Sequence, residues 1–214
     1  MADIYQPYFP QTNIFTASYG LLDYPKNSTD TIIKAFSENL RIIFVGNISI
    51  EKGCFYLLEA MKKLSNTKVE LDLIGELNKH QLEVFKPFFN VKNVRFLGKL
   101  PNSKIHEILP HYHVFALPSL SDAYSLAVSE ALAHKLPVII TDNVGNKEDI
   151  KKFEVGQICE AKNSDAIVDA ILSLQNEAYR QYLSANITNF IEDNKLNSYP
   201  SKVLKVYEHL LTNH

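Results

Sequence analysis

Two hydrophobic patterns alternate along most of the chain. Short apolar runs rich in β-branched and aromatic residues, typical of buried parallel strands, occupy residues 41–46, 68–75, 93–98, 113–118, 137–141 and 156–160. Segments with apolar residues spaced three or four apart, typical of helices, occupy 54–64, about 79–89, 103–109, a stretch carrying Glu130, and a short stretch near Asn146. Strands and helices that alternate at this spacing predict βαβ crossovers and a parallel sheet.

The two ends of the chain depart from this alternation. From residue 164 onward only helical patterns occur, the last of them after Pro200. The first 40 residues are interrupted by prolines and contain one candidate strand, over 13–19. Asn102 or Ser103 is available to cap the helix over 103–109. The sequence therefore predicts a Rossmann-like, three-layer α/β domain over 41–195, with a parallel sheet of about six strands, followed by a C-terminal helical segment over 196–214.

Composition narrows the class of protein. The chain has 214 residues, 46% of them hydrophobic, and a net charge of −2 at pH 7. Without a basic excess, a broad nucleic-acid footprint is not expected. Cys54 and Cys159 lie far apart and form no C-x-x-C pair, so we expect buried or incidental thiols. No apolar run approaches the roughly 20 residues of a membrane span, and no signal-peptide pattern opens the chain, which predicts a cytoplasmic location.

The stretch from residue 118 to 137 carries the first candidate chemistry. A strand ends at Pro118, a polar loop carries Asp122, and a helix predicted to begin near Tyr124 carries Glu130. Ligands of parallel sheets bind at the carboxyl ends of the strands, where helix N-termini favour phosphate. A carboxylate amid apolar residues needs a partner, which ligand hydroxyls could supply to Glu130. Two acids at this spacing also occur by chance in many proteins.

A second candidate lies in GNISIEKG, residues 46–53, after the first strand. Lys52 and Gly53 are predicted at the N-terminus of the next helix, at the same edge of the sheet, where a lysine can bind phosphate as a point charge. An exposed surface lysine is the alternative. The segment lacks the G-x4-G-K-[ST] spacing of an NTPase loop. His111 and His113 lie two apart, but without a third ligand they do not predict a metal site.

Several segments in this order resemble one family: VGN, EKG and LLEAM, then LIGEL, then NVRFLGKLP, then FALPSLSDAYSLAVSEALAHKLPVIITDNVG. They resemble the carboxyl-terminal domain of the retaining glycosyltransferases of family 4, which have the two-domain GT-B fold. The resemblance implies the donor-binding half of an enzyme that transfers a sugar from a nucleotide diphosphate to a saccharide or lipid-linked acceptor. The donor would be UDP- or GDP-linked and a substrate, and no cofactor or metal is implied.

The resemblance also implies roles for individual residues. Glu130 matches the second glutamate of the family's E-x7-E motif, at the donor ribose, and Asp122 stands where the first glutamate contacts the transferred sugar. Lys52 matches the lysine on the diphosphate, so Lys52 and Asp122 are the candidate catalytic residues. The implied donor-binding positions are Gly46, Asn47, Lys52, Gly75, Glu76, Gly98, Lys99, Leu100, Asp122, Ala123, Tyr124, Ser125, Leu126 and Glu130. Among these, 98–100 would face the base, and the backbone N–H groups of 124–126 would face the sugar and diphosphate.

This chain departs from the family at several of these positions. Asn47 replaces the arginine that usually follows the first strand's glycine, so one of two cations on the diphosphate is missing. Asp122 is one methylene shorter than the usual glutamate, and Ala123 and Ser125 replace glycines. Losing a charge-assisted contact should weaken donor binding and leaving-group stabilisation. The changes suggest an altered donor, or a weakened or lost activity.

The largest departure is length, because family members are usually about twice as long. Residues 1–40 resemble only the end of the amino-terminal domain and its linker. The partners implied are therefore a nucleotide sugar and an amino-terminal domain or separate subunit, with a homodimer and peripheral membrane association of the complete enzyme as further candidates, and no nucleic acid. Two alternatives remain: a catalytically silent nucleotide-binding or scaffolding domain that partners another glycosyltransferase subunit, and a different nucleotide-sugar enzyme such as an epimerase.

Overall fold

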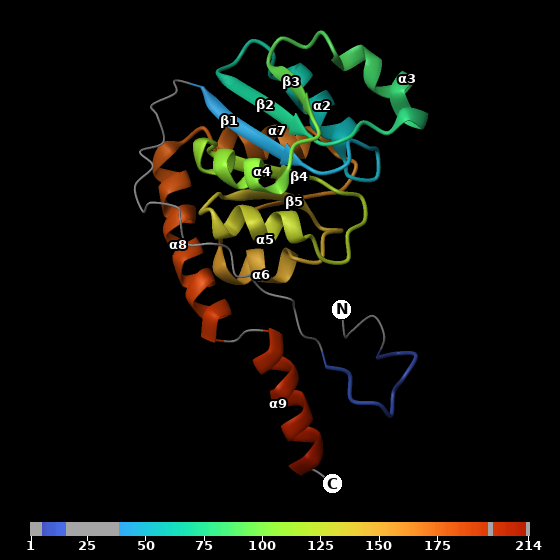
Figure 1. Ribbon diagram of the computed structural model, residues 1–214, viewed down its shortest axis with the longest axis vertical. Helices are drawn as coiled ribbons and strands as arrows, with labels where there is room; N and C mark the ends of the chain where they lie inside the picture. Colours follow the sequence, from blue (N-terminus) through green and yellow to red (C-terminus); the bar gives the residue numbers. More distant parts are fainter. Residues whose placement is uncertain (1–5, 16–38, 197–198, 213–214) are drawn as a thin grey trace.

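The central element is a single parallel sheet (Figure 1). The structure is a computed structural model that describes residues 6–15, 39–196 and 199–212. The sheet has six strands in the order β3-β2-β1-β4-β5-β6. Their bounds are β1 (Leu40–Val45), β2 (Val69–Ile74), β3 (Val94–Gly98), β4 (Val114–Leu117), β5 (Val138–Thr141) and β6 (Gly156–Cys159). The predicted Rossmann-like α/β class and the six predicted strands are confirmed.

The strand order reverses next to β1. From β1 the chain moves outward to β2 and β3, then crosses back to β4 on the other side of β1 and continues to β5 and β6. Strand β1 pairs with β4 through Ile42 and Val114, and through Ile43 and Phe115. The loops that follow β1 and β4 therefore leave the sheet side by side at its carboxyl edge. In open α/β sheets this switch point is where ligands bind.

Helices cover both faces of the sheet, as a three-layer domain requires (Figure 1). One layer contains α2 (Cys54–Lys63) and α7 (Ser164–Ser173), and the other contains α4 (Asn102–Ile108), α5 (Leu126–Ala133) and α6 (Lys147–Phe153). Helix α8 (Glu177–Leu196) packs against α5 and α6, and α9 (Tyr199–Thr212) extends beyond the sheet. Every residue of β4 and β5 is buried. Coverage on both faces explains why these strands are continuous apolar runs.

Some local predictions differ from the structure. The helix expected over 79–89 is broken into a 3₁₀ turn (Lys79–Gln81), α3 (Leu82–Phe85) and a second 3₁₀ turn (Lys86–Phe88). Pro87 lies in the last turn and has no N–H to continue an α-helical ladder. Another 3₁₀ turn (Leu109–His111) follows α4.

The predicted cap of α4 is also wrong. Asn102 is the first residue of the helix, Pro101 occupies the cap position, and no side chain caps this end. Of the strand expected over 13–19, residues 13–15 are irregular, and 16–19 lie outside the described residues. Because most of the first 40 residues also lie outside them, the predicted domain boundaries stay predictions.

A charged network joins β1, β2 and β3. Asp72 on β2 is 2% exposed and accepts two hydrogen bonds from Arg95 on β3, each 2.6 Å long. The Tyr112 hydroxyl also donates to Asp72, and Arg41 on β1 lies 3.8 Å from the same carboxylate. Burial and the bond to Asp72 raise the pKa of Tyr112. His113 Nδ1 accepts from the Arg41 backbone N–H at 2.9 Å, so this histidine supports the strand ends.

Candidate functional site

The loop after β1 holds Lys52 in a fixed position at the carboxyl edge. The Ser49 hydroxyl accepts a hydrogen bond from the Lys52 N–H at 3.2 Å, which closes a tight turn before α2. Gly53 follows with a φ of 74°. A Cβ atom at Gly53 would lie 1.7 Å from the Pro118 carbonyl oxygen, so only glycine fits. The loop therefore packs directly on the end of β4, as the prediction for Lys52 and Gly53 requires.

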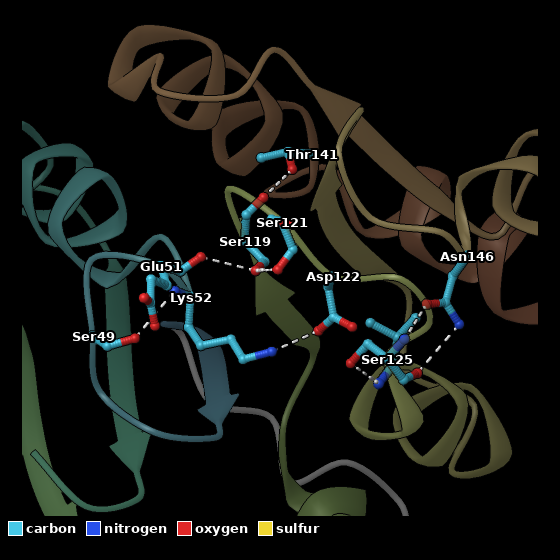
Figure 2. Close-up of polar contacts among 10 residues, drawn as sticks. Ser49, Glu51, Lys52, Ser119, Ser121, Asp122, Ser125, Thr141 and Asn146 are labelled. Atoms are coloured by element: carbon cyan, nitrogen blue, oxygen red, sulfur yellow. Dashed lines mark hydrogen bonds and ion pairs between the residues drawn. The ribbon is translucent and has the colours of Figure 1, made fainter. Parts of the chain in front are cut away.

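The loop after β4 is fixed on both sides. Leu120 N–H donates to the Glu51 carbonyl at 2.8 Å, and the Ser119 hydroxyl lies 2.9 Å from the same oxygen. On the other side, the Thr141 hydroxyl at the end of β5 donates to the Ser119 carbonyl. Residues 118–125, which we call the β4–α5 loop, are thus held between the loops after β1 and β5 (Figure 2).

Lys52 and Asp122 meet across the switch point. Lys52 Nζ lies 2.8 Å from Asp122 Oδ2, and the side chains are 34% and 12% exposed (Figure 2). The two residues come from the loops after β1 and β4, 70 positions apart in the sequence. An ammonium group has three donor hydrogens, so Lys52 keeps donor capacity beyond this contact. The geometry therefore presents a partly exposed cation where an anionic ligand of this fold would lie.

Helix α5 begins beside this ion pair. Ser125 is its N-cap, and the Ser125 hydroxyl accepts from the Val128 N–H at 3.4 Å. The first helical residue is Leu126, so the helix starts two residues later than the predicted Tyr124. The N–H groups of Leu126 and Ala127 have no preceding helical turn to supply acceptors. They leave a partial positive charge at the carboxyl edge of the sheet.

One contact implied by the resemblance is engaged elsewhere. The Ser125 N–H donates to Asn146 Oδ1 at 2.8 Å, so a ligand could accept from it only if this bond broke. Tyr124 is half-buried, and its hydroxyl lies 3.4 Å from the Ser129 hydroxyl. In this conformation, the backbone N–H groups available as hydrogen-bond donors to a ligand are therefore those of the first turn of α5.

Glu130 is the fifth residue of α5 and is half-buried. It lies four residues after Leu126, which is 46% exposed, so the two residues share a face of the helix. Val128 and Leu132 lie on the face buried against the sheet. Glu130 is thus on the open face of α5, the face that carries the exposed Leu126, and away from the face buried against the sheet.

The remaining predicted positions come to the same edge. Gly75 N–H donates to the Gly98 carbonyl at 2.9 Å, and a Cβ atom at Gly75 would lie 1.8 Å from the Gly46 carbonyl oxygen. The loops after β1, β2 and β3 are therefore stacked side by side. The exposed positions in these loops and in the β4–α5 loop are Asn47, Glu76, Lys99 and Ala123, while Leu100 is half-buried. The structure brings every predicted donor-binding position to the carboxyl edge.

The loop after β5 is the part that the sequence analysis missed. Gly145 N–H donates to the Asp122 carbonyl at 2.8 Å, and Asp122 N–H donates to the Asn143 carbonyl at 3.2 Å. Asn146 contacts Ser125 (Figure 2). The sequence does contain a signal for this loop. The segment TDNVGN comes at the end of the fifth predicted strand, so the residues after that strand are expected at the same carboxyl edge. Among the described residues, no group of three or more His, Cys, Asp and Glu side chains is placed to hold a metal ion.

The family follows from comparison with known proteins. The family model "Glycosyl transferases group 1" matches residues 25–190, and the chain belongs to this family. Its fold is that of the GT-B neighbours described next. No helix in the described ranges is long and apolar enough to cross a membrane.

Individual relatives agree with this assignment. An uncharacterized glycosyltransferase of Methanocaldococcus jannaschii is 29% identical over 152 residues, which are 68% of this chain and 38% of the relative. The structure of S. aureus TarM, in complex with fondaparinux, α-GlcNAc-glycerol and UDP, has a TM-score of 0.74 at 19% identity over 97% of this chain and 41% of that one. The C-terminal domain of a group 1 glycosyl transferase, LpcC of Francisella tularensis, has a TM-score of 0.65 at 23% identity over 72% of this chain and 85% of that one. The chain spans well under half of the M. jannaschii relative.

Proposed function

We propose that this chain is the donor-binding half of a retaining glycosyltransferase of family 4, and that it binds the nucleoside diphosphate of a sugar donor between β1 and β4. The observation that carries the proposal is the contact between Lys52 and Asp122 at the switch point, 2.8 Å across, beside the N-terminus of α5. Membership of the group 1 family supports a sugar nucleotide as the ligand. The UDP in the TarM structure supports a nucleoside diphosphate.

In the proposed complex, each charged group has a separate task. Lys52 and the first turn of α5 stabilise the negative charge on the diphosphate as it leaves, which is electrostatic catalysis at a preorganised site. Asp122 then exchanges its contact with Lys52 for hydroxyl groups of the transferred sugar. Glu130, on the open face of α5, accepts hydrogen bonds from the ribose hydroxyls. The base lies against 98–100, and the reaction needs no metal ion.

The rest of the enzyme is proposed to lie outside these residues. A preceding domain or a separate subunit would bind the saccharide or lipid-linked acceptor. The match to the C-terminal domain of LpcC supports this arrangement. A cytoplasmic enzyme that meets its acceptor at the membrane surface fits this proposal.

One observation favours a second candidate, a catalytically silent domain that binds a nucleotide or scaffolds another glycosyltransferase. Asn47 is an exposed neutral residue at the position where the family usually has arginine. Lys52 would then face the diphosphate without the second cation. Donor binding without transfer by the complete assembly would favour this candidate over the enzyme.

Calorimetric titration of the chain with UDP, GDP and ADP tests the proposal. We expect one of these to bind with a 1:1 stoichiometry. Lys52→Ala should weaken binding about tenfold or more, because a partly buried charge-assisted contact is worth about 1.5–3 kcal/mol. Glu130→Ala should weaken it by less, because ribose hydroxyls are neutral partners.

Lys63→Ala is the matched control for Lys52→Ala. Lys63 lies at the end of α2 and pairs with Asp165 at 2.6 Å, so its removal deletes the same charge and the same type of ion pair. The Lys63 variant should bind like the parent chain. If no nucleotide binds, or if the two lysine variants bind equally well, the site assignment is wrong.

A further inference from the structure

We propose that Asn146 is a positioning residue that orients the first turn of α5 toward the diphosphate. The inference rests on the proposed function and adds to it a residue from the β5–α6 loop, which carries none of the predicted donor contacts. Asn146 is 2% exposed, and its side chain is turned toward Ser125 (Figure 2).

The Asn146 side-chain amide bonds to Ser125 as a backbone amide of a neighbouring strand would, with one acceptor and one donor. Its Oδ1 accepts from the Ser125 N–H at 2.8 Å, and its Nδ2 donates to the Ser125 carbonyl at 3.2 Å. Nδ2 also lies 3.5 Å from the Ser129 hydroxyl, one turn further along α5. Both backbone groups of the N-cap residue are thus held by one amide, as a neighbouring strand would hold them.

The position of Asn146 in its own helix makes this use of the side chain informative. Asn146 is the N-cap of α6, where asparagine ordinarily accepts from an N–H of its own first turn. Here its side chain makes no capping bond to α6 and bonds to α5 instead. The amide therefore stabilises the start of the neighbouring helix in preference to its own.

The rest of the β5–α6 loop holds the same part of the chain. Gly145 N–H donates to the Asp122 carbonyl at 2.8 Å, and a Cβ atom at Gly145 would lie 1.8 Å from the Ala123 carbonyl oxygen. The Gly145 N–H thus holds the backbone of Asp122, and the Asn146 side chain holds the N-cap of α5. The loop sets both the acid that contacts Lys52 and the direction of the free N–H groups.

This role predicts a specific loss. The first turn of α5 contacts the phosphate groups, so Asn146→Ala should act mainly on the β-phosphate, which is the difference between a nucleoside diphosphate and its monophosphate. For the base that the parent chain prefers, we expect diphosphate affinity to fall about tenfold and monophosphate affinity to fall less than about threefold. The measured ratio is the dissociation constant of the monophosphate divided by that of the diphosphate, and it should fall in the variant. Calorimetry with UDP and UMP, or with the corresponding guanine or adenine pair, gives both constants.

Asn93→Ala is the matched control. Asn93 Nδ2 likewise donates to backbone, to the carbonyls of Met61 and Leu64, but at the opposite edge of the sheet. This variant loses the same type of contact and should keep the parent's ratio. If Asn146→Ala does not fold, Asn146→Asp preserves the shape and the acceptor, removes the donor to the Ser125 carbonyl, and should also lower the ratio.

The outcomes separate the two levels of the proposal. A folded Asn146 variant whose ratio equals that of the parent, or an Asn93 variant that lowers the ratio as much, overturns the role of Asn146 alone. Failure of the parent chain to bind any nucleotide overturns the proposed function, and the inference falls with it.

Discussion

Asp72 and Asp122 are both paired with basic side chains, but they differ in solvent exposure and in the number of hydrogen-bond partners. Asp72 is 2% exposed and receives two bonds from Arg95, a third from Tyr112 and a more distant charge from Arg41. Asp122 is 12% exposed, and Lys52, its partner at 2.8 Å, is 34% exposed. The first carboxylate is held by residues of two neighbouring strands and by Tyr112, and the second lies between two loops at the carboxyl edge.

The difference separates a structural charge from the charge for which we propose a function. A buried carboxylate whose acceptor sites are filled by planar arginine and tyrosine donors cannot exchange partners without a large loss of stability. A lysine ammonium at a partly exposed loop can turn toward a new anion at little cost, because such pairs contribute only about 0–1 kcal/mol. The Asp72 network therefore serves stability, and ligand exchange remains our proposal for the pair formed by Lys52 and Asp122.

The largest expected effect is on the Asp72 network. Asp72→Asn should lower the free energy of unfolding by about 2–3 kcal/mol, because its amide presents donors to the donors of Arg95 and Tyr112. Asp122→Asn is the matched change at the carboxyl edge and should cost less than about 1 kcal/mol. Urea unfolding followed by circular dichroism measures both. Equal losses in the two variants would remove the distinction drawn here.

A smaller effect is expected on ligand binding at Asp122. Removing the charge of Asp122 frees Lys52 from a competing anion, so Asp122→Asn should raise affinity for the bare nucleoside diphosphate by up to about fivefold. Affinity for the complete sugar nucleotide should rise less or fall, since the carboxylate is proposed to contact the sugar. Titration of both ligands checks this. A fall in affinity for the bare diphosphate would mean that Asp122 holds Lys52 in its binding position.

The last prediction concerns a pair of histidines and the change of stability with pH. His106 Nδ1 lies 3.0 Å from His134 Nε2, between α4 and the end of α5. Burial, together with the nearby His106, lowers the pKa of His134 from 6.5 to about 4. The unfolded chain therefore binds a proton at His134 at higher pH than the folded chain does. Stability from this source is complete above about pH 6.5 and is lost as the pH falls toward 4.

His134→Gln should reduce the fall in unfolding free energy between pH 6.5 and pH 4. Urea unfolding at several pH values measures the slope, with His111→Gln as the control for loss of an exposed histidine. An unchanged slope in the His134 variant would show that other groups carry the acid sensitivity.

Much of the fold was readable from the sequence because both sheet faces are covered. Buried strands then appear as apolar runs, and their alternation with helices fixed the parallel class. The broken helix after β2 was not readable, because the spacing of its apolar residues is helical and only Pro87 argues against one continuous element. Likewise, α5 begins later than predicted because Ser125 has an extended backbone and caps the helix with its side chain. A hydrophobic pattern does not reveal such a cap.

The candidate site divides in the same way. The positions of Lys52, Asp122 and Glu130 relative to strand ends could be predicted, since loops after parallel strands meet at one edge. The direct contact between Lys52 and Asp122 could not be predicted, because it depends on the close packing of Gly53 against Pro118 at the end of the neighbouring strand. Asn146 was missed for a similar reason, since its partner Ser125 lies 21 residues away in another loop.

The most direct test of the central claim is an amide NMR titration of the isotopically labelled chain with the nucleoside diphosphate that calorimetry selects. The account predicts that the largest shift changes fall at the carboxyl edge, in residues 46–53, 75–76, 98–100 and 122–130, and that the amino ends of the strands around Asn93 stay unchanged. Shift changes centred on the amino edge or on α9, or no saturable changes at all, would contradict it.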